Sequence, residues 1–352
     1  MKKGEFFLTP LTVASMILII SHSVFAAAPR QSVSFSHKDW DLICDNTLTC
    51  RAVGYAANDT ENGATVLLTR AAGPDTAVVN QVMLAHYDDD NEANNNQSPT
   101  LTIDNQGFGQ LTESQDESWQ MNDEQFAAFM TALRQDKPIS FEDSSQQYSL
   151  SGAGSTAVLL KMDDVQGRVA TPGALIKKGQ KSESTVYPAQ ELPVINKAPV
   201  KDASVRDMND QEEALIKPEI MKLISADKEN GCTEDMLAQK WQIARLNDSQ
   251  SLVKAACWMA AYNDGDIYYL INNDMKSAPQ LVSDSANDYN DGVLFFSMKG
   301  RGLGDCWSHQ SWVWDGHAFV ESERGNTGRC MLIRPGGAWD LPEIKSKVIE
   351  GQ

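Results

Sequence analysis

The sequence predicts an α+β fold: two mainly antiparallel β regions with a few helices, stapled by disulfide bonds. Short runs of alternating apolar and polar residues, bounded by Gly, Asn and Asp, recur along the 352 residues and are typical of antiparallel strands. Amphipathic helical patterns are few by comparison. Six cysteines fall in three close pairs, which favours disulfide bonds inside each region.

Residues 1–26 are predicted to be an export signal. Lys2 and Lys3 precede an apolar stretch over 6–20, and the small residues at 24–28 suit a signal peptidase. A membrane anchor is the alternative, but polar residues within the stretch leave it short of the roughly 20 apolar residues that span a bilayer. We therefore expect a periplasmic mature chain without membrane insertion.

The charge balance bears on possible partners. The chain carries 30 Lys and Arg against 48 Asp and Glu, a net charge of −18. Phosphate backbones and anionic membrane surfaces repel such a protein, so we expect no nucleic-acid partner. A cationic protein would be attracted, although acidity also serves plain solubility.

Disulfide bonds are the expected state of the cysteines, because an exported chain folds in an oxidising compartment. Sequence neighbours close short loops at the least entropic cost, so neighbour pairing is preferred among the 15 possible connectivities. The predicted pairs are Cys44 with Cys50, Cys232 with Cys257, and Cys306 with Cys330. Metal binding is the alternative, but no Cys-x-x-Cys occurs and the histidines are scattered, so we expect no metal and no cofactor.

The first region, 27–176, is predicted to be an α+β domain that opens with a hairpin pinned by its own disulfide. The predicted strands are 33–37, 40–44, 50–55, 64–69, 78–86 and 101–103. The Asp and Asn residues at 88–96 indicate a solvated loop; a cation site there is the alternative, although adjacent acids lack the alternating spacing of a calcium loop.

Two helices are predicted in this region. Asn122 caps the first, with Gln125 at the reciprocal position of a capping box. The second follows the Gly-rich segment 151–155, with Ser155 as its cap. A Gly-rich turn before a helix can cradle an anion, but this one lacks the lysine and the spacing of a phosphate loop.

Residues 177–204, rich in Lys, Ser and Pro, are predicted to be an extended linker to a second α+β domain, 205–352. The predicted helices of that domain are 209–216, 220–224, after a break at Pro218, and one beginning at Thr233. Its later part is predicted to be antiparallel sheet, with a turn at 264–265 between two strands.

A hairpin is predicted around Asp-Gly at 315–316, a dipeptide that tolerates tight turns. A two-residue loop there places Trp314 opposite His317 and Trp312 opposite Phe319. This aromatic face is either part of the core or a docking surface.

The segment 299–309 is the best candidate for a ligand site. Its three glycines let backbone amides approach a ligand, and Lys299 and Arg301 supply positive charge for a carboxylate or phosphate of a small anionic ligand. The alternative is a tight chain crossing held by the Cys306 bridge, with Arg301 paired to Asp305.

Asp305, Ser308 and His309 also suggest a hydrolase. Triad residues normally meet from distant segments, however, and no Gly-x-Ser-x-Gly elbow occurs. We therefore assign no catalytic residue and leave enzyme activity uncertain, leaning against it. The ligand-binding candidates are Lys299, Arg301, Asp305 and His309.

On its motifs, the chain resembles the bacterial family called domain of unknown function 1176. The motifs are WDLICDN at 40–46, TCRA at 49–52, AYN at 261–263, KGRGLGDC at 299–306 and WVWDG at 312–316. The resemblance implies exported, usually periplasmic proteins with six characteristic cysteines, and it implies no activity. Trp307 departs from the glycine expected there.

The first region is more weakly similar to the invasion-associated locus B family, through its Trp-x-x-x-Cys start at Trp40. That similarity implies a surface or periplasmic interaction role. We therefore expect an exported periplasmic binding or interaction protein, directed at a cationic partner such as a cell-wall hydrolase. The alternative is an envelope hydrolase or a small-ligand-binding enzyme that uses 299–309.

Overall fold

The computed structural model describes residues 31–58, 62–85, 98–114, 116–144, 146–227 and 231–351. These residues form mainly antiparallel sheets with a few helices and three disulfide bonds, which confirms that part of the predicted fold class. The cysteines pair with their sequence neighbours, as the spacing predicts. The predicted signal at 1–26, His86 and the loop at 88–96 lie outside the described residues.

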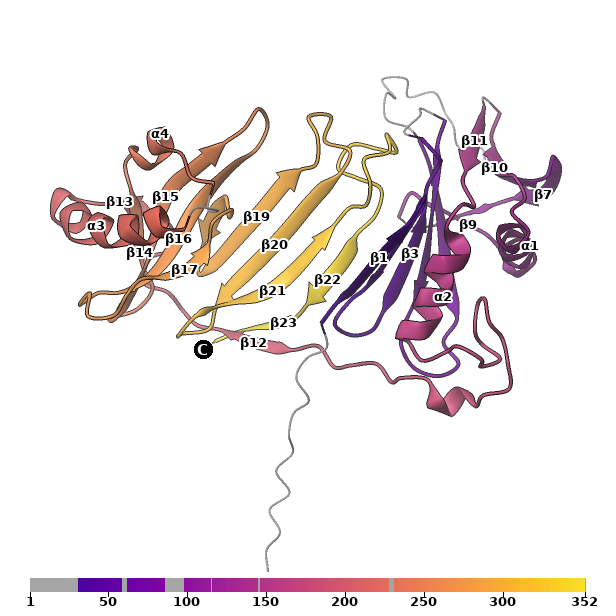
Figure 1. The fold of residues 1–352 in the computed structure, drawn as a ribbon, viewed down its shortest axis with the longest axis horizontal. Helices are drawn as coiled ribbons and strands as arrows, with labels where there is room; N and C mark the ends of the chain where they lie inside the picture. Colours follow the sequence, from indigo (N-terminus) through magenta and orange to yellow (C-terminus); the bar gives the residue numbers. More distant parts are fainter. Residues whose placement is uncertain are drawn as a thin grey trace, which may run out of the picture.

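The N-terminal sheet, at the right of Figure 1, has seven antiparallel strands. In spatial order they are β1 (Val33–His37), β2 (Trp40–Cys44), β3 (Cys50–Gly54), β4 (Ala64–Arg70), β5 (Val78–Leu84), β9 (Trp119–Gln120) and β8 (Thr112–Glu113). Cys44 lies directly opposite Cys50, so the predicted disulfide-pinned hairpin is confirmed.

A second, four-stranded sheet and two helices cover one face of the N-terminal sheet. The small sheet contains β11 (Gln147–Leu150), β10 (Ile139–Glu142), β6 (Thr100–Ile103) and β7 (Gln106–Gln110). Helix α1 (Asp123–Arg134) has the predicted capping box of Asn122 and Gln125. Their apolar residues share one core with Leu42 and Val66 of the sheet.

Helix α2 (Ser155–Val165) begins one residue earlier than predicted, so Gly154 and not Ser155 is its N-cap. Gly154 has a φ of +97°, and a Cβ added to it would lie 1.9 Å from the carbonyl oxygen of His37. Only glycine fits this close approach to the end of β1. The Gly-rich turn therefore packs against backbone.

The segment predicted to be a linker runs along the bottom of the molecule in Figure 1. It contains a 3₁₀ turn, η1 (Glu183–Thr185), and a strand, β12 (Val194–Lys197). Strand β12 pairs in parallel with β23 (Lys347–Glu350), close to the C-terminus. The pairing of β12 with β23 thus fixes this segment to the last strand of the described residues.

The outer sheet, at the left of Figure 1, packs against α3 (Asp210–Ala226) and α4 (Glu234–Leu237). Its strands are β13 (Arg206–Asp207), β14 (Gln242–Arg245), β15 (Gln250–Met259), β16 (Asp264–Asn272) and β17 (Gln280–Ser283). The predicted break at Pro218 is wrong, because α3 runs through it. Pro218 lies on the exposed side, while Ile216, Ile220 and Ile224 bury the opposite stripe and hold both halves of the helix on the sheet.

The predicted turn at 264–265 is also misplaced. Asp264 and Gly265 already pair with Met259 and Trp258 as the first residues of β16, and the turn lies just before them. A Cβ on Gly265 would lie 2.4 Å from the ring of Trp258, so this glycine makes room for an indole across the strand pair.

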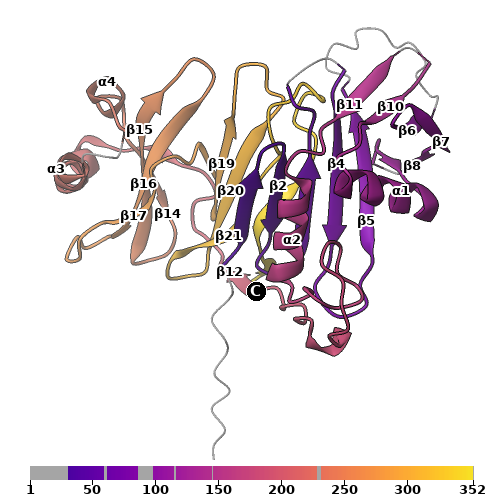
Figure 2. The ribbon, with the colours of Figure 1, turned by 45° about the vertical axis from the view of Figure 1, so that its right-hand side comes forward.

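The central sheet lies between the outer and the N-terminal sheets (Figures 1 and 2). Its strands are β18 (Asp288–Asn290), β19 (Val293–Lys299), β20 (Trp307–Trp314), β21 (Phe319–Asn326) and β22 (Leu341–Lys345). The β20–β21 loop has four residues, so Trp314 pairs with Phe319 instead of His317. Asp315 accepts hydrogen bonds from the N–H groups of His317 and Ala318, which lengthens the predicted turn.

Trp314 is fully buried in the apolar cluster between the outer and central sheets, and Trp312 and Phe319 pack against that cluster. The aromatic face of the hairpin is therefore core. On the other side of the molecule, the segment 331–341 packs Ile333 and Trp339 onto Val53 and Leu67 of the N-terminal sheet. That sheet is thus buried on both faces.

Among the described residues, no helix combines the length and the apolar character needed to cross a membrane.

Candidate functional site

Strands β19 and β20 place two of the predicted site residues on one face of the central sheet. Lys299 lies opposite Trp307, and Ser297 lies opposite His309. Because alternate residues of a strand share a face, Lys299 and His309 point to the same side. We call this side the central face and define it by Phe295, Ser297, Trp307, His309 and Ser311.

Arg301 and Asp305 form a two-point ion pair instead of presenting their charges to solvent. The guanidinium donates from Nε at 2.8 Å and from Nη2 at 2.6 Å to the two carboxylate oxygens. The N–H of Leu332 donates to the same carboxylate at 2.8 Å. Asp305 is 1% exposed, so the pair has the geometry expected of a closed chain crossing.

The pKa of Asp305 follows from these contacts. Burial raises the pKa, but the hydrogen bonds from Arg301 and from the Leu332 N–H outweigh it and hold the pKa below 3.8. The carboxylate is therefore ionised and fully occupied by its partners. It contributes to the stability of the loop and has no geometry for proton transfer.

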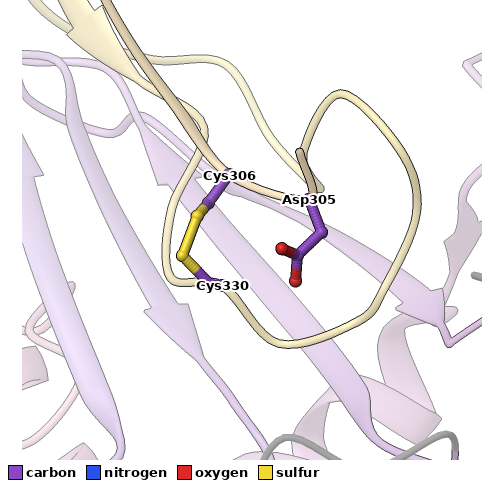
Figure 3. A group of neighbouring side chains, drawn as sticks. All are labelled: Asp305, Cys306 and Cys330. Carbon is purple, nitrogen blue, oxygen red and sulfur yellow. A yellow bond between two sulfur atoms is a disulfide. The ribbon is translucent and has the colours of Figure 1, made fainter. Parts of the chain in front are cut away.

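The same loop contains the Cys306–Cys330 disulfide. Figure 3 shows the Asp305 carboxylate beside the two bonded sulfur atoms. One oxygen and both sulfurs lie within 4.8 Å of one another, which is the spacing of a small metal site. Disulfide sulfurs are not thiolates, however, and thiolates are the form of cysteine that binds metals. The Cys306–Cys330 disulfide beside Asp305 therefore has a structural role in the loop.

Asn263 connects the AYN motif to the KGRGLGDC motif. Its side-chain amide donates to the carbonyl oxygen of Lys299, and its side-chain oxygen accepts from the N–H of Lys299, both at 2.9 Å. Beside this contact, Tyr262 and Leu303 are 47% and 52% exposed. The β15–β16 turn and the 299–306 loop therefore form one continuous surface.

His309 is not joined to Asp305 or to Ser308. Ser308 is its neighbour along β20, so the two side chains leave opposite faces of the sheet. His309 instead approaches Glu323, with 3.6 Å between His309 Nε2 and Glu323 Oε1. The hydrolase group suggested by the sequence is therefore not assembled.

An acidic cluster borders the central face where the outer and central sheets meet. Asp288 lies opposite Phe295, and the side chain of Asn287 bridges the backbones of Asp264 and Ser297. Asp266 forms the only ion pair in this cluster among the described residues, with Lys254 at 3.0 Å. We call Asp264, Asp266 and Asp288 the acidic junction.

The negative charge of this junction affects the pKa of Asp266. Burial, followed by the carboxylates of Asp264 and Asp288, raises the pKa of Asp266 above 3.8, although Lys254 lowers it. Asp264 and Asp288 are exposed and have no ion-pair partner among the described residues. The sequence indicated only a turn here, because the two acids come together from different sheets.

Two hollows lie away from these residues. One of about 560 Å³ lies on the small N-terminal sheet and is lined by Thr100, Thr102 and Glu142. Another of about 260 Å³ lies between Trp119 and Arg334. Neither contains any of the predicted site residues.

The comparisons with known proteins identify the family. A model described as "Protein of unknown function (DUF1176)" matches residues 34–345, so the chain belongs to this family. It is 26% identical over 331 residues to "Uncharacterized protein YpfG" of Escherichia coli (strain K12), covering 86% of this chain and 89% of that protein. No solved structure matches significantly. The family resemblance seen in the motifs is thereby confirmed.

Proposed function

We propose that this protein is an exported, periplasmic binding protein that docks a cationic protein partner. The observation that carries the proposal is the meeting of the acidic junction with the central face. Asp288 lies directly beside Phe295, whose side chain is 41% exposed. A surface with exposed carboxylates next to an exposed aromatic ring suits a partner that has Lys or Arg side chains around an apolar contact.

The form of the central sheet supports docking. In Figures 1 and 2, no helix lies across β19 or β20. The first six residues of β20 are all partly exposed, whereas buried antiparallel strands show a covered face. An uncovered sheet face with aromatic residues is the type of surface that protein partners cover.

The net charge of −18 supports a cationic partner, because it steers oppositely charged molecules toward the protein. Export is supported by the three disulfide bonds, which persist in oxidising compartments. We propose a basic cell-wall hydrolase as the partner class, because its charge is opposite to that of this protein.

The test is calorimetric titration with a cationic lysozyme at low salt. The double variant Asp264→Asn, Asp288→Asn removes two charges from the acidic junction and keeps the side-chain shapes. Glu113→Gln with Glu191→Gln is the matched control, since both residues are exposed, lie elsewhere and have no ion pair among the described residues. We expect the junction variant to bind at least about tenfold more weakly and the control to bind normally. If the junction variant and the control variant bind the lysozyme with equal affinity, the acidic junction does not contribute to docking.

A hydrolase function of the central face is the second candidate. The observation that favours it is Ser297, which lies opposite His309, while Glu323 approaches the same imidazole. Among the described residues, no hydrogen bond joins Ser297 to His309, and a nucleophile needs that contact to be activated. Hydrolysis of p-nitrophenyl acetate by the wild type, abolished in both Ser297→Ala and His309→Ala, would establish this function. A rate equal to buffer alone would exclude it for this substrate class.

A further inference from the structure

A pocket of about 290 Å³ lies between the first half of α3 and the outer sheet. None of the three residues of the acidic junction lines it. Its lining includes Leu215 and Ile216 of α3, Ile243 and Arg245 of β14, and Ile271 of β16. Much of the lining thus comes from one helix and two strands, which keep a site's shape better than loops do.

The floor of the pocket is apolar. Ile216, Ile243 and Ile271 belong to the buried cluster beneath α3 and are at most 5% exposed. Leu215 stands at the mouth and is 58% exposed. An alkyl chain entering the pocket would cover this leucine and meet the isoleucines, which the hydrophobic effect favours.

Most charged groups of the pocket are already paired. Arg206 donates two hydrogen bonds to Glu212, which holds the pKa of Glu212 down to about 2. Asp248 pairs with Lys201. Asp202, nearby, accepts a hydrogen bond from the backbone N–H of Arg245.

The guanidinium of Arg245 is the exception. It makes no hydrogen bond and no ion pair within 4.0 Å among the described residues, although its charge lowers the pKa of Glu212 and of Asp248, which also line the pocket. A guanidinium binds a carboxylate through two parallel hydrogen bonds. The pocket therefore offers one cation whose hydrogen-bond donors have no direct partner among the described residues, beside a small apolar cavity.

Met275 is a second residue whose conformation supports a ligand site in this pocket. It lines the pocket with a φ of +52°, the left-handed region that favours glycine or asparagine. Its side chain packs against the buried cluster under α3. The turn keeps a methionine in an unfavourable backbone conformation, and so places a flexible apolar side chain at the cavity.

We propose that this pocket binds an aliphatic monocarboxylate, with the carboxylate on Arg245 and the alkyl chain on Leu215 and the isoleucine floor. The pocket volume of about 290 Å³ limits the size of the ligand, since it is close to the lower limit of ligand pockets, which span roughly 300 to 1,000 Å³. A medium-chain fatty acid fits this description. The site is separate from the proposed docking surface and does not depend on it.

The test is calorimetric titration of the full mature chain with octanoate. Octan-1-ol keeps the chain and lacks the charge, and butanoate keeps the charge and shortens the chain. Each is expected to bind at least about tenfold more weakly than octanoate, because charge-assisted hydrogen bonds and buried methylene groups each contribute that much. Octanol binding as tightly as octanoate would overturn the role of the cation.

Variants separate the pocket from nonspecific binding. Arg245→Gln is expected to weaken octanoate about tenfold and leave octanol unchanged, and Arg245→Lys is expected to retain part of the affinity. Lys222→Gln on the same helix is the control and should bind normally, because Lys222 is outside the lining. If Arg245→Gln folds and binds octanoate like the wild type, or if the wild type binds none, the proposal is wrong.

Discussion

Arg329 and Asp41 join the two parts of the chain through a two-point ion pair. Nε and Nη2 of Arg329 donate to the two oxygens of Asp41 at 2.8 and 2.7 Å. The backbone N–H of Arg329 also donates to the hydroxyl of Tyr55, and its guanidinium lies 5.2 Å from that ring. A residue of the connection between β21 and β22 of the central sheet is thereby fixed onto β2 and the end of β3.

We expect Arg329→Gln to lower the free energy of unfolding by about 1–3 kcal/mol, because it breaks a bidentate and partly buried pair. Asp41→Asn should have a similar effect, and the double variant should cost less than the sum. Urea denaturation of the four proteins measures this coupling. Glu117→Gln is the control: it removes the 88% exposed carboxylate that pairs with Arg334, so the loss should be at most about 1 kcal/mol. Strict additivity at Arg329 and Asp41 would contradict the pairing.

Gly154→Ala is predicted to destabilise the protein by at least about 3 kcal/mol. The new Cβ combines a φ of +97° with a clash at 1.9 Å against the His37 carbonyl oxygen. Gly336→Ala is the matched control, with a φ of +84° but nothing within 4 Å of its Cβ, and should cost only about 1–2 kcal/mol. Denaturation midpoints of the two variants compare these costs. Equal losses would mean that the contact with His37 does not matter.

Asp305→Asn is predicted to destabilise the protein by about 2–4 kcal/mol at neutral pH, since it leaves Arg301 without its anionic partner. The folded-state pKa of Asp305 is below 3.8, so the carboxylate's contribution is complete above that value and disappears as the pH falls through the lower folded pKa. The stability difference between wild type and variant should therefore shrink in acid. Denaturation curves across this pH range measure it, with Glu323→Gln as the exposed control. A difference that stays constant into acid would contradict the assignment.

The disulfides should contribute unequally. Cys306 and Cys330 are separated by 24 residues and Cys44 and Cys50 by 6, and a larger loop restricts the unfolded chain more. Replacing the first pair by serine is expected to cost about 3 kcal/mol, and replacing the second about 2 kcal/mol. Urea denaturation of both double variants gives the ranking. A larger loss from the short loop would show that native packing dominates over chain entropy.

Local signals explain what the sequence predicted well. The capping box at Asn122 and Gln125 and the hairpin closed by Cys44 and Cys50 depend on residues a few positions apart, so their patterns are readable in the chain. The pairing of Arg301 with Asp305 is equally local, and it was recognised as the alternative to an anion site.

Longer-range contacts account for the errors. The local sequence predicts a helix break at Pro218, because the packing of α3 on the outer sheet is not visible locally. The turn at 264–265 was misplaced because Gly265 serves the ring of Trp258 across the strand pair. The acidic junction was missed for the same reason, since Asp264 and Asp288 belong to different sheets. Tertiary packing overrides local turn and helix signals at these positions.

Docking of a cationic protein on the acidic junction and the central face, as proposed above, can be followed by hydrogen exchange of backbone amides. Exchange is measured with and without a cationic lysozyme at low salt. We expect slower exchange in β18, β19 and β20 on binding, no change in α1 and the small N-terminal sheet, and loss of the effect at high salt. Protection confined to another part of the chain, or no protection at low salt, would contradict it.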